Sequence, residues 1–204
     1  MTVARLLIAA LMLAAVIHDL SAAISGGSFV FWNFFGYFTI QTNLIGIVAL
    51  VIAARFTGLA RPQWVEYLRA FAATYLVIVV TVFWTLLAPT AEGLWTWTNL
   101  VLHGLSGAVL LADWLLEGPR RGLPLRKVWL VLIYPVMWAT VVLVRGATDG
   151  WFPYPFLDPE NGYGSIAVVV AGIFVAGLVV GGLLFSATRW RRVVPDAAPL
   201  DSAP

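Results

Sequence analysis

The sequence predicts an all-α, polytopic membrane protein with six transmembrane helices in one bundle and both termini in the cytoplasm. Three observations lead to this fold class: the composition, the long apolar runs and the distribution of the basic residues. Of the 204 residues, 61% are hydrophobic and 11% are charged, and the mean hydropathy is +0.92. Soluble domains carry about 25% charged residues, so the composition indicates an integral membrane protein.

Six apolar runs approach the roughly 20 residues that an α-helix needs to cross the hydrocarbon core of a bilayer. They cover residues 4–24, 36–55, 68–88, 97–116, 127–147 and 165–187. His18 and Asp19 interrupt the first run. Because the core of a cleaved signal peptide is uniformly apolar, we expect this run to persist as a membrane helix.

The last two runs and the C-terminus have features of their own. Pro135 lies within the fifth run and should kink its helix, because proline removes a backbone donor. The sixth run has small residues at close spacing, which let helices approach each other and offer a face for a homo-oligomer: Gly172, Ala176, Gly177, Gly181 and Gly182. We expect residues 1–190 to form a single transmembrane domain and residues 191–204 to form a disordered cytoplasmic tail.

The basic residues lie almost entirely on one side of this arrangement. Eleven of the twelve lie near the start, around the second connection, in the fourth connection or after the last run: Arg5, Arg55, Arg61, Arg69, Arg120, Arg121, Arg126, Lys127, Arg189, Arg191 and Arg192. Only Arg145 lies beside an outer connection. The positive-inside rule makes the basic side cytoplasmic, which favours an even number of helices in the cell membrane.

The composition also excludes some classes of function. A formal net charge of +2 is too small for a nucleic-acid-binding protein. The chain has no cysteine, so it forms neither a disulfide framework nor a thiolate metal site. We expect no metal ion and no cofactor, and we expect membrane lipids or lipid-like molecules as partners.

A polar face marks the beginning of the second predicted helix. At about 100° per residue, Thr39, Thr42, Asn43 and Gly46 lie on one side of this helix. Lipid cannot satisfy the hydrogen-bonding groups of these side chains, so they must face protein or trapped water.

Ionisable residues inside a membrane are costly and point to function. With a rise of about 1.5 Å per residue, the topology places Asp19, Thr39, Thr42 and His103 in one layer on the extracytoplasmic side. Asp113 lies about 15 Å deeper than His103, where we expect it to pair with an arginine of the inner side.

This layer contains the components of a nucleophile and base pair. A threonine hydroxyl is a weak nucleophile and needs an adjacent base, and neutral histidine is the usual one. Thr39 or Thr42 can therefore pair with His103, and Asp19 or Asn99 can orient the ring. The residues alone leave a second interpretation open, in which the threonine bonds back to its own helix and the histidine bonds across the bundle.

Aromatic residues crowd the outer connections, as at Phe31, Trp32 and Trp95. These rings can form an interfacial belt, or some of them can line the mouth of a lipid-binding cleft. In the second case, the candidates for the substrate mouth are Trp151, Tyr154 and Asp158.

Three segments share a pattern with a known family. The first segment is Tyr37-Phe38-Thr39-Ile40, at the beginning of the second helix. The second is His103-Gly104-Leu105-Ser106, and Asp113 follows ten residues after its histidine. The third covers residues 151–158 and reads WFPYPFLD. In this order and spacing they resemble the androgen-induced-gene-like (androgen-dependent TFPI-regulating protein) family of multi-pass membrane proteins, whose third segment reads W-x-Y-P-F-L-E. The resemblance extends over roughly residues 5–187 and includes the helix count.

The resemblance implies an activity. Characterised members of the family are intramembrane threonine hydrolases that cleave fatty acid esters of hydroxy fatty acids. Carried over to this chain, the nucleophile is Thr39, the base is His103 and the substrate is a lipid ester. The chain departs from the family where Leu100 replaces a second histidine and where Thr42 shares the face of Thr39.

Other possibilities stay open at this point. A non-catalytic lipid-binding or transport protein needs the polar layer only as a pocket. A carrier of b-type haem needs His18 and His103 as axial ligands, because the chain has only two histidines. For a hydrolase, the oxyanion needs hydrogen-bond donors, and Thr42, Asn43 and Asn99 are the candidates.

Overall fold

The computed structural model describes residues 1–90, 94–117 and 122–187. Six helical spans in this part of the chain are long and apolar enough to cross a membrane: Thr2–Ser25, Phe38–Arg55, Gln63–Leu87, Trp97–Leu116, Leu125–Thr148 and Tyr163–Ser186. They confirm the predicted all-α fold with six membrane helices. The tail predicted at residues 191–204 lies outside the described residues.

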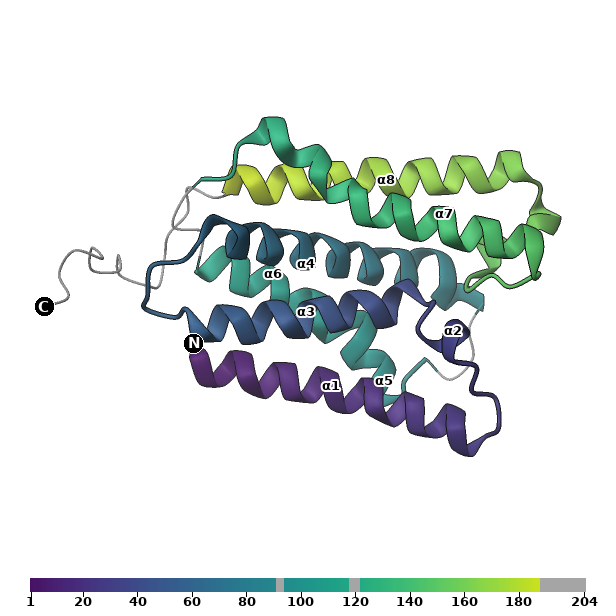
Figure 1. The fold of residues 1–204 in the computed structure, drawn as a ribbon, viewed down its shortest axis with the longest axis horizontal. Coiled ribbons are helices and arrows are strands. Elements are labelled where there is room, and N and C mark those ends of the chain that lie inside the picture. Colours follow the sequence, from purple (N-terminus) through teal and green to yellow (C-terminus); the bar gives the residue numbers. More distant parts are fainter. Residues whose placement is uncertain (91–93, 118–121, 188–204) are drawn as a thin grey trace, which may run out of the picture.

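Three of the spans are single α-helices and three are composite (Figure 1). The single helices are α1 (Thr2–Ser25), α3 (Phe38–Arg55) and α8 (Tyr163–Ser186). The first composite span joins α4 (Gln63–Val82) to the π-helical η1 (Phe83–Leu87). The second joins α5 (Trp97–Leu100), the π-helical η3 (Val101–Leu105) and α6 (Ser106–Leu116). The third joins the 3₁₀-helical η4 (Leu125–Leu132) to α7 (Ile133–Thr148). Within the described residues, the connections contain four short helices: α2 (Phe31–Phe34), η2 (Ala88–Thr90), η5 (Pro155–Leu157) and η6 (Pro159–Asn161).

Helix α4 lies in the middle of the bundle, where it packs against α3, α6 and α8. Helix α1 packs on α3 at one edge, and α7 and α8 form the opposite edge (Figure 1). The beginning of α1 and the end of α8 lie at the same end of the bundle, and α2 lies at the other end. We call the end that carries α2 the α2 end.

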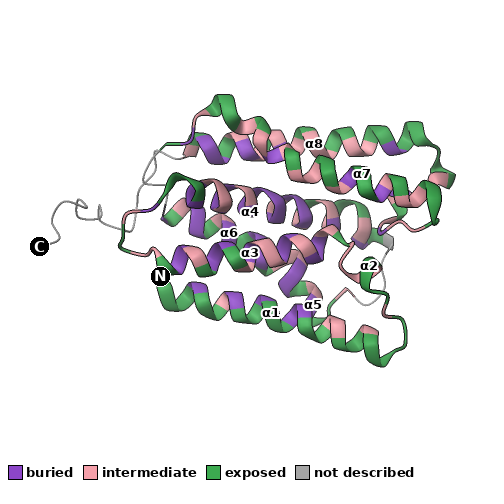
Figure 2. Cartoon of the chain, in the orientation of Figure 1, coloured by how far each residue is buried: buried purple, intermediate pink, exposed green. Residues whose placement is uncertain are grey.

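Burial follows this arrangement (Figure 2). Half of the residues in the most apolar stretch of the α3 span and of the α4–η1 span are buried, but only 22% of those in α1 and in α8 are buried. The outer helices expose large apolar side chains, for example Leu7, Val168 and Leu183. Apolar side chains on the outside of a helical bundle are expected where the surroundings are lipid.

A buried ion cluster joins the helices at the end where α1 begins. Arg5 Nε donates to Asp113 Oδ1 over 2.6 Å, and Arg69 Nη2 donates to Asp113 Oδ2 over 2.8 Å. Glu66 pairs with Arg69, and Glu117 pairs with Arg5. Asp113 therefore pairs with two of the arginines that the sequence assigns to the basic side of the bundle.

The same cluster explains why the third span begins earlier than predicted. The sequence placed its start at residue 68, after Glu66, whereas α4 begins at Gln63. Glu66 and Arg69 are both buried and bonded to each other over 3.0 Å. Pairing inside the bundle allows these charges to lie within the helix.

The predicted kink at Pro135 is wrong in its position. Pro135 is the third residue of α7, and the irregular segment is the 3₁₀-helical η4 that precedes the α-helix. The first N–H groups of an α-helix have no partner within the helix, so proline is tolerated there without a kink.

Part of the small-residue face of α8 is used within the chain. A Cβ atom at Gly181 would lie 3.4 Å from the side chains of Val128 and Val131 in η4, and one at Gly177 would lie 3.7 Å from Leu132. Gly172 and Gly182 have no such neighbour within 4 Å. A homo-oligomer through this face stays a prediction.

Candidate functional site

The hydroxyl of Thr39 and the ring of His103 meet toward the α2 end. Thr39 Oγ1 lies 3.2 Å from His103 Nε2, within hydrogen-bond distance. Thr39 is the second residue of α3 and is 7% exposed, and His103 is the middle residue of η3. In the tautomer that carries its proton on Nδ1, the imidazole accepts the Thr39 hydrogen at Nε2.

Two facing π-helical turns hold His103 in place. The backbone of His103 departs from the α-helix, with φ of −118° and ψ of 15°. The ring of Phe83, in η1, stacks on the imidazole with centroids 4.0 Å apart, and Trp84 Nε1 donates to the His103 carbonyl over 2.8 Å. π-Helical turns within α-helices occur frequently at functional sites.

Tyr154 completes the group of polar side chains around Thr39. Its hydroxyl accepts a hydrogen bond from the Thr39 backbone N–H over 3.2 Å and lies 3.3 Å from Thr39 Oγ1. When Thr39 Oγ1 donates to His103, the phenol of Tyr154 can donate to Thr39 Oγ1. Burial raises the pKa of Tyr154, so the phenol stays protonated.

The loop that carries Tyr154 is fixed against the beginning of α3. Tyr154 has an extended backbone and stands between Pro153 and Pro155, which restrict the chain on both sides. The carbonyl of Gly36 accepts a hydrogen bond of 2.8 Å from Trp138 Nε1. A Cβ atom at Gly36 would overlap the indole of Trp151 and lie 2.6 Å from the Trp32 carbonyl, so only glycine fits.

An apolar cavity and a more polar cavity meet at Thr39. The apolar cavity has a volume of about 60 Å³ and the polar cavity has a volume of about 450 Å³, and both are partly open to the outside. Four side chains line both cavities: Thr39, Phe83, Leu87 and Tyr154.

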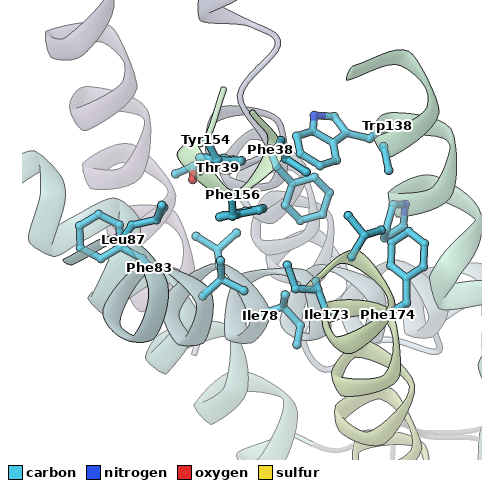
Figure 3. A pocket seen from close by; sticks show the side chains of 16 residues that line it. Phe38, Thr39, Ile78, Phe83, Leu87, Trp138, Tyr154, Phe156, Ile173 and Phe174 are labelled. Carbon is cyan, nitrogen blue, oxygen red and sulfur yellow. Dashed lines mark hydrogen bonds between the residues drawn. The ribbon is translucent and has the colours of Figure 1, made fainter. Parts of the chain in front are cut away.

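The apolar cavity extends from Thr39 toward α7 and α8. Its far side is formed by Trp138, Ile173 and Phe174 (Figure 3). The figure shows Thr39 and Tyr154 together, with Phe83 and Leu87 beside them and the α7 and α8 side chains across the cavity.

The polar cavity extends from Thr39 toward α1. His103 and Asp19 line it together with aromatic rings. Thr39 therefore stands between an apolar space and a space lined by the imidazole of His103 and the carboxylate of Asp19.

Three predicted supporting residues point to backbone carbonyls instead. Thr42 Oγ1 donates to the Phe38 carbonyl over 2.8 Å, Asn43 Nδ2 donates to the Thr39 and Leu102 carbonyls over 2.9 and 3.2 Å, and Asn99 Nδ2 donates to the Leu94 carbonyl over 2.9 Å. These bonds use the donors proposed for an oxyanion. Asn43 still helps to hold the site together, because its bond to the Leu102 carbonyl links α3 to the residue before His103.

The orienting group for His103 is also different from the prediction. Neither Asp19 nor the Asn99 side chain bonds to Nδ1, and Nδ1 forms no hydrogen bond of ordinary geometry within the described part of the chain. The backbone carbonyl of Asn99 lies near the ring. Stacking on Phe83 and anchoring by Trp84 fix the imidazole instead.

His18 is not brought to the same point as His103. Its side chain is 55% exposed, with Nδ1 lying 3.3 Å from Asp19 Oδ1 and its ring edge-on to Trp97. It lines neither of the two cavities, and Nε2 of His103 faces Thr39. The arrangement therefore does not fit two axial ligands of one haem.

The three residues predicted at the substrate mouth have different positions. Tyr154 reaches Thr39 itself. Trp151 packs over Gly36, and the guanidinium of Arg145 lies 4.2 Å from its ring centroid. Asp158 caps η6 by accepting from the Glu160 N–H over 2.9 Å. Trp151 and Asp158 therefore support the loop, and neither lines the two cavities.

Comparison of the chain with protein-family models, with curated proteins and with solved structures gives no match. The resemblance to the androgen-induced-gene-like family therefore stays a prediction from the three sequence segments.

Proposed function

We propose that this protein is an intramembrane lipid-ester hydrolase in which Thr39 is the nucleophile and His103 is the general base. The observation that carries the proposal is the distance of 3.2 Å between Thr39 Oγ1 and His103 Nε2, at the junction of the two cavities. A hydroxyl and a base at hydrogen-bond distance are the minimal arrangement for nucleophilic catalysis. The resemblance to the threonine hydrolases points to the same pair.

The reaction follows from this pair. The hydroxyl oxygen of Thr39 attacks the ester carbonyl carbon while its proton passes to His103 Nε2. The tetrahedral intermediate then collapses, the bond to the alcohol oxygen breaks, and His103 returns the proton to the leaving alcohol. Water next attacks the acyl-threonine and gives its proton to His103, and the carboxylic acid leaves as Thr39 regains a hydrogen.

Tyr154 is the group placed to stabilise the oxyanion. Its hydroxyl lies 3.3 Å from Thr39 Oγ1 and can donate to the carbonyl oxygen that develops charge when Thr39 attacks.

The lining of the apolar cavity fits the fatty acyl part of the substrate. Its side chains beyond Thr39 and Tyr154 are apolar, and Trp138, Ile173 and Phe174 come from the two helices at the edge of the bundle. A substrate dissolved in the membrane can reach Thr39 between helices. We further propose that the site faces the extracytoplasmic side of the cell membrane, as the basic residues predict.

Labelling by a fluorophosphonate probe tests the proposal in purified protein. Thr39→Ala should abolish labelling, and His103→Ala should slow it by about 10²- to 10⁴-fold, because general-base assistance is lost. Thr42→Val, a nearly isosteric change of the buried neighbour, should still label. Undiminished labelling of both Thr39→Ala and His103→Ala would refute the assignment, whereas loss only in Thr42→Val would move the nucleophile to Thr42.

The same experiment separates the hydrolase from a non-catalytic lipid-binding or transport protein. Such a protein would not react with the probe at a single threonine, although it would still bind lipid. Equal lipid binding by wild type and Thr39→Ala, with no labelling of either, would favour the non-catalytic function.

A further inference from the structure

The lining of the polar cavity combines aromatic rings with an acidic side chain. Four aromatic rings line it, those of Phe34, Tyr37, Phe83 and Tyr154. Asp19 contributes a carboxylate. No Lys or Arg is found in this lining among the residues that the structure describes.

This lining matches the chemistry of a quaternary ammonium group. The faces of aromatic rings carry negative potential and attract cations, and cages of such rings are a recognised way to bind trimethylammonium groups. A carboxylate at the rim adds a favourable charge. The Asp19 side chain is 36% exposed, and its Oδ1 lies 3.3 Å from His18 Nδ1.

An anionic group fits the polar cavity poorly. The nearest outer basic residue in the chain, Arg145, is already bound to Asp149 over 2.8 Å, to Asn33 over 2.9 Å and to the ring of Trp151. The N–H of Thr39, at the beginning of α3, is bonded to Tyr154. A phosphate or a free carboxylate would therefore meet Asp19 without a compensating cation.

Thr39 fixes which part of an ester lies in which cavity. Attack at the carbonyl carbon leaves the acyl chain on one side of Thr39 and the alcohol on the other. Since the apolar cavity suits the acyl chain, the alcohol lies in the polar cavity, beside Asp19 and the rings.

We propose that the polar cavity is a subsite for a cationic leaving group, and that the substrate class is a single-chain fatty acyl ester of a quaternary ammonium alcohol. This inference rests on the hydrolase function proposed above. Asp19, which the sequence offered as an orienter of His103, becomes a residue that determines specificity.

The test compares three palmitate esters hydrolysed by the purified protein in nanodiscs. The first is palmitoylcholine, the second is its neutral isostere with a tert-butyl group in place of trimethylammonium, and the third is the anionic ester of glycolic acid. We expect kcat/KM for palmitoylcholine to exceed that for the neutral isostere by about 5- to 30-fold. The glycolic acid ester should be the poorest substrate.

Asp19→Asn tests the carboxylate with little change of shape. It should lower the preference for choline over the neutral isostere by about two- to fivefold, as expected for an exposed charge pair. Glu160→Gln is the matched control, since Glu160 is an exposed acid of the outer loop and lines neither cavity. It should leave the preference unchanged.

The outcomes separate the subsite from the hydrolase function. If the wild type cleaves the neutral isostere as well as palmitoylcholine, or if Asp19→Asn keeps the full preference, the cationic subsite is refuted and the hydrolase stands. If no ester is cleaved and no fluorophosphonate label is taken up, the hydrolase is refuted. In that case the preference is measured by binding alone, from the dissociation constants of palmitoylcholine and its neutral isostere with the Thr39→Ala protein. Equal dissociation constants would refute the subsite as well.

Discussion

The hydroxyl of Tyr154 contacts both the backbone nitrogen and the side-chain oxygen of Thr39, at 3.2 and 3.3 Å, although the two residues are 115 positions apart in the chain. In the first contact the phenol oxygen accepts the Thr39 N–H, and in the second the phenol can donate to Oγ1. Thr39 Oγ1 therefore lies between an acceptor, His103 Nε2, and a group that can donate to the oxyanion.

Tyr154→Phe removes only the phenol oxygen. If Tyr154 stabilises the oxyanion, its loss should slow fluorophosphonate labelling by about 10²- to 10³-fold, as the loss of one oxyanion donor does in other hydrolases. Tyr163→Phe serves as the control, because Tyr163 is 59% exposed at the start of α8. Equal labelling rates in wild type and Tyr154→Phe would show that the phenol has no such role.

The contribution of Tyr154 should persist at alkaline pH. Burial raises the pKa of Tyr154 above its ordinary value of 10.0, and an acid with a raised pKa keeps its proton to higher pH. The ratio of labelling rates between wild type and Tyr154→Phe should therefore stay constant from neutral pH to about pH 10. A ratio that falls toward one well below that pH would mean that the phenol ionises and is not protected by burial.

Gly36→Ala should disturb the loop over the site. A methyl group at this position overlaps Trp151 and approaches the Trp32 carbonyl to 2.6 Å, so the loop carrying Tyr154 must move. We expect slower labelling with the bundle still folded. Gly164→Ala is the matched control because its Cβ atom would have no neighbour within 4 Å; if both variants label like wild type, the loop does not position the site.

The fold could be predicted largely from the sequence, because six apolar runs and one-sided charge leave few arrangements in a bilayer. The deviations occur where tertiary pairing overrides composition. Glu66 lies outside the apolar run that begins at residue 68, yet it is buried within α4, where it pairs with Arg69.

The site could be predicted only in part. Depth placed Thr39 and His103 in one layer, and the family resemblance paired them. Asn99, offered as an orienter of His103 or a donor to the oxyanion, has its side-chain amide bonded to the Leu94 carbonyl in the structure. Phe83 and Trp84 lie in an apolar run and have no feature in the sequence that distinguishes them. Tyr154 was a candidate for the substrate mouth, but the sequence did not reveal its contact with Thr39.

Asp113→Asn should destabilise the bundle strongly. Asp113 accepts from both Arg5 and Arg69, and removal of its charge leaves two buried guanidinium groups with one carboxylate fewer. Breaking a buried ion pair costs about 3–5 kcal/mol, so the unfolding midpoint in detergent should fall markedly. Glu160→Gln, in the exposed outer loop, should leave the midpoint unchanged; an equally stable Asp113→Asn protein would contradict the account of the ion cluster.

The central claim is that Thr39 is the nucleophile, and mass spectrometry of the probe adduct tests it most directly. After reaction of the wild-type protein with a fluorophosphonate, fragmentation of the peptide that contains residues 37–43 should place the added mass on Thr39. The same peptide from His103→Ala protein should carry far less adduct. An adduct on Thr42 or on another residue, or no adduct in a folded protein, would contradict the account.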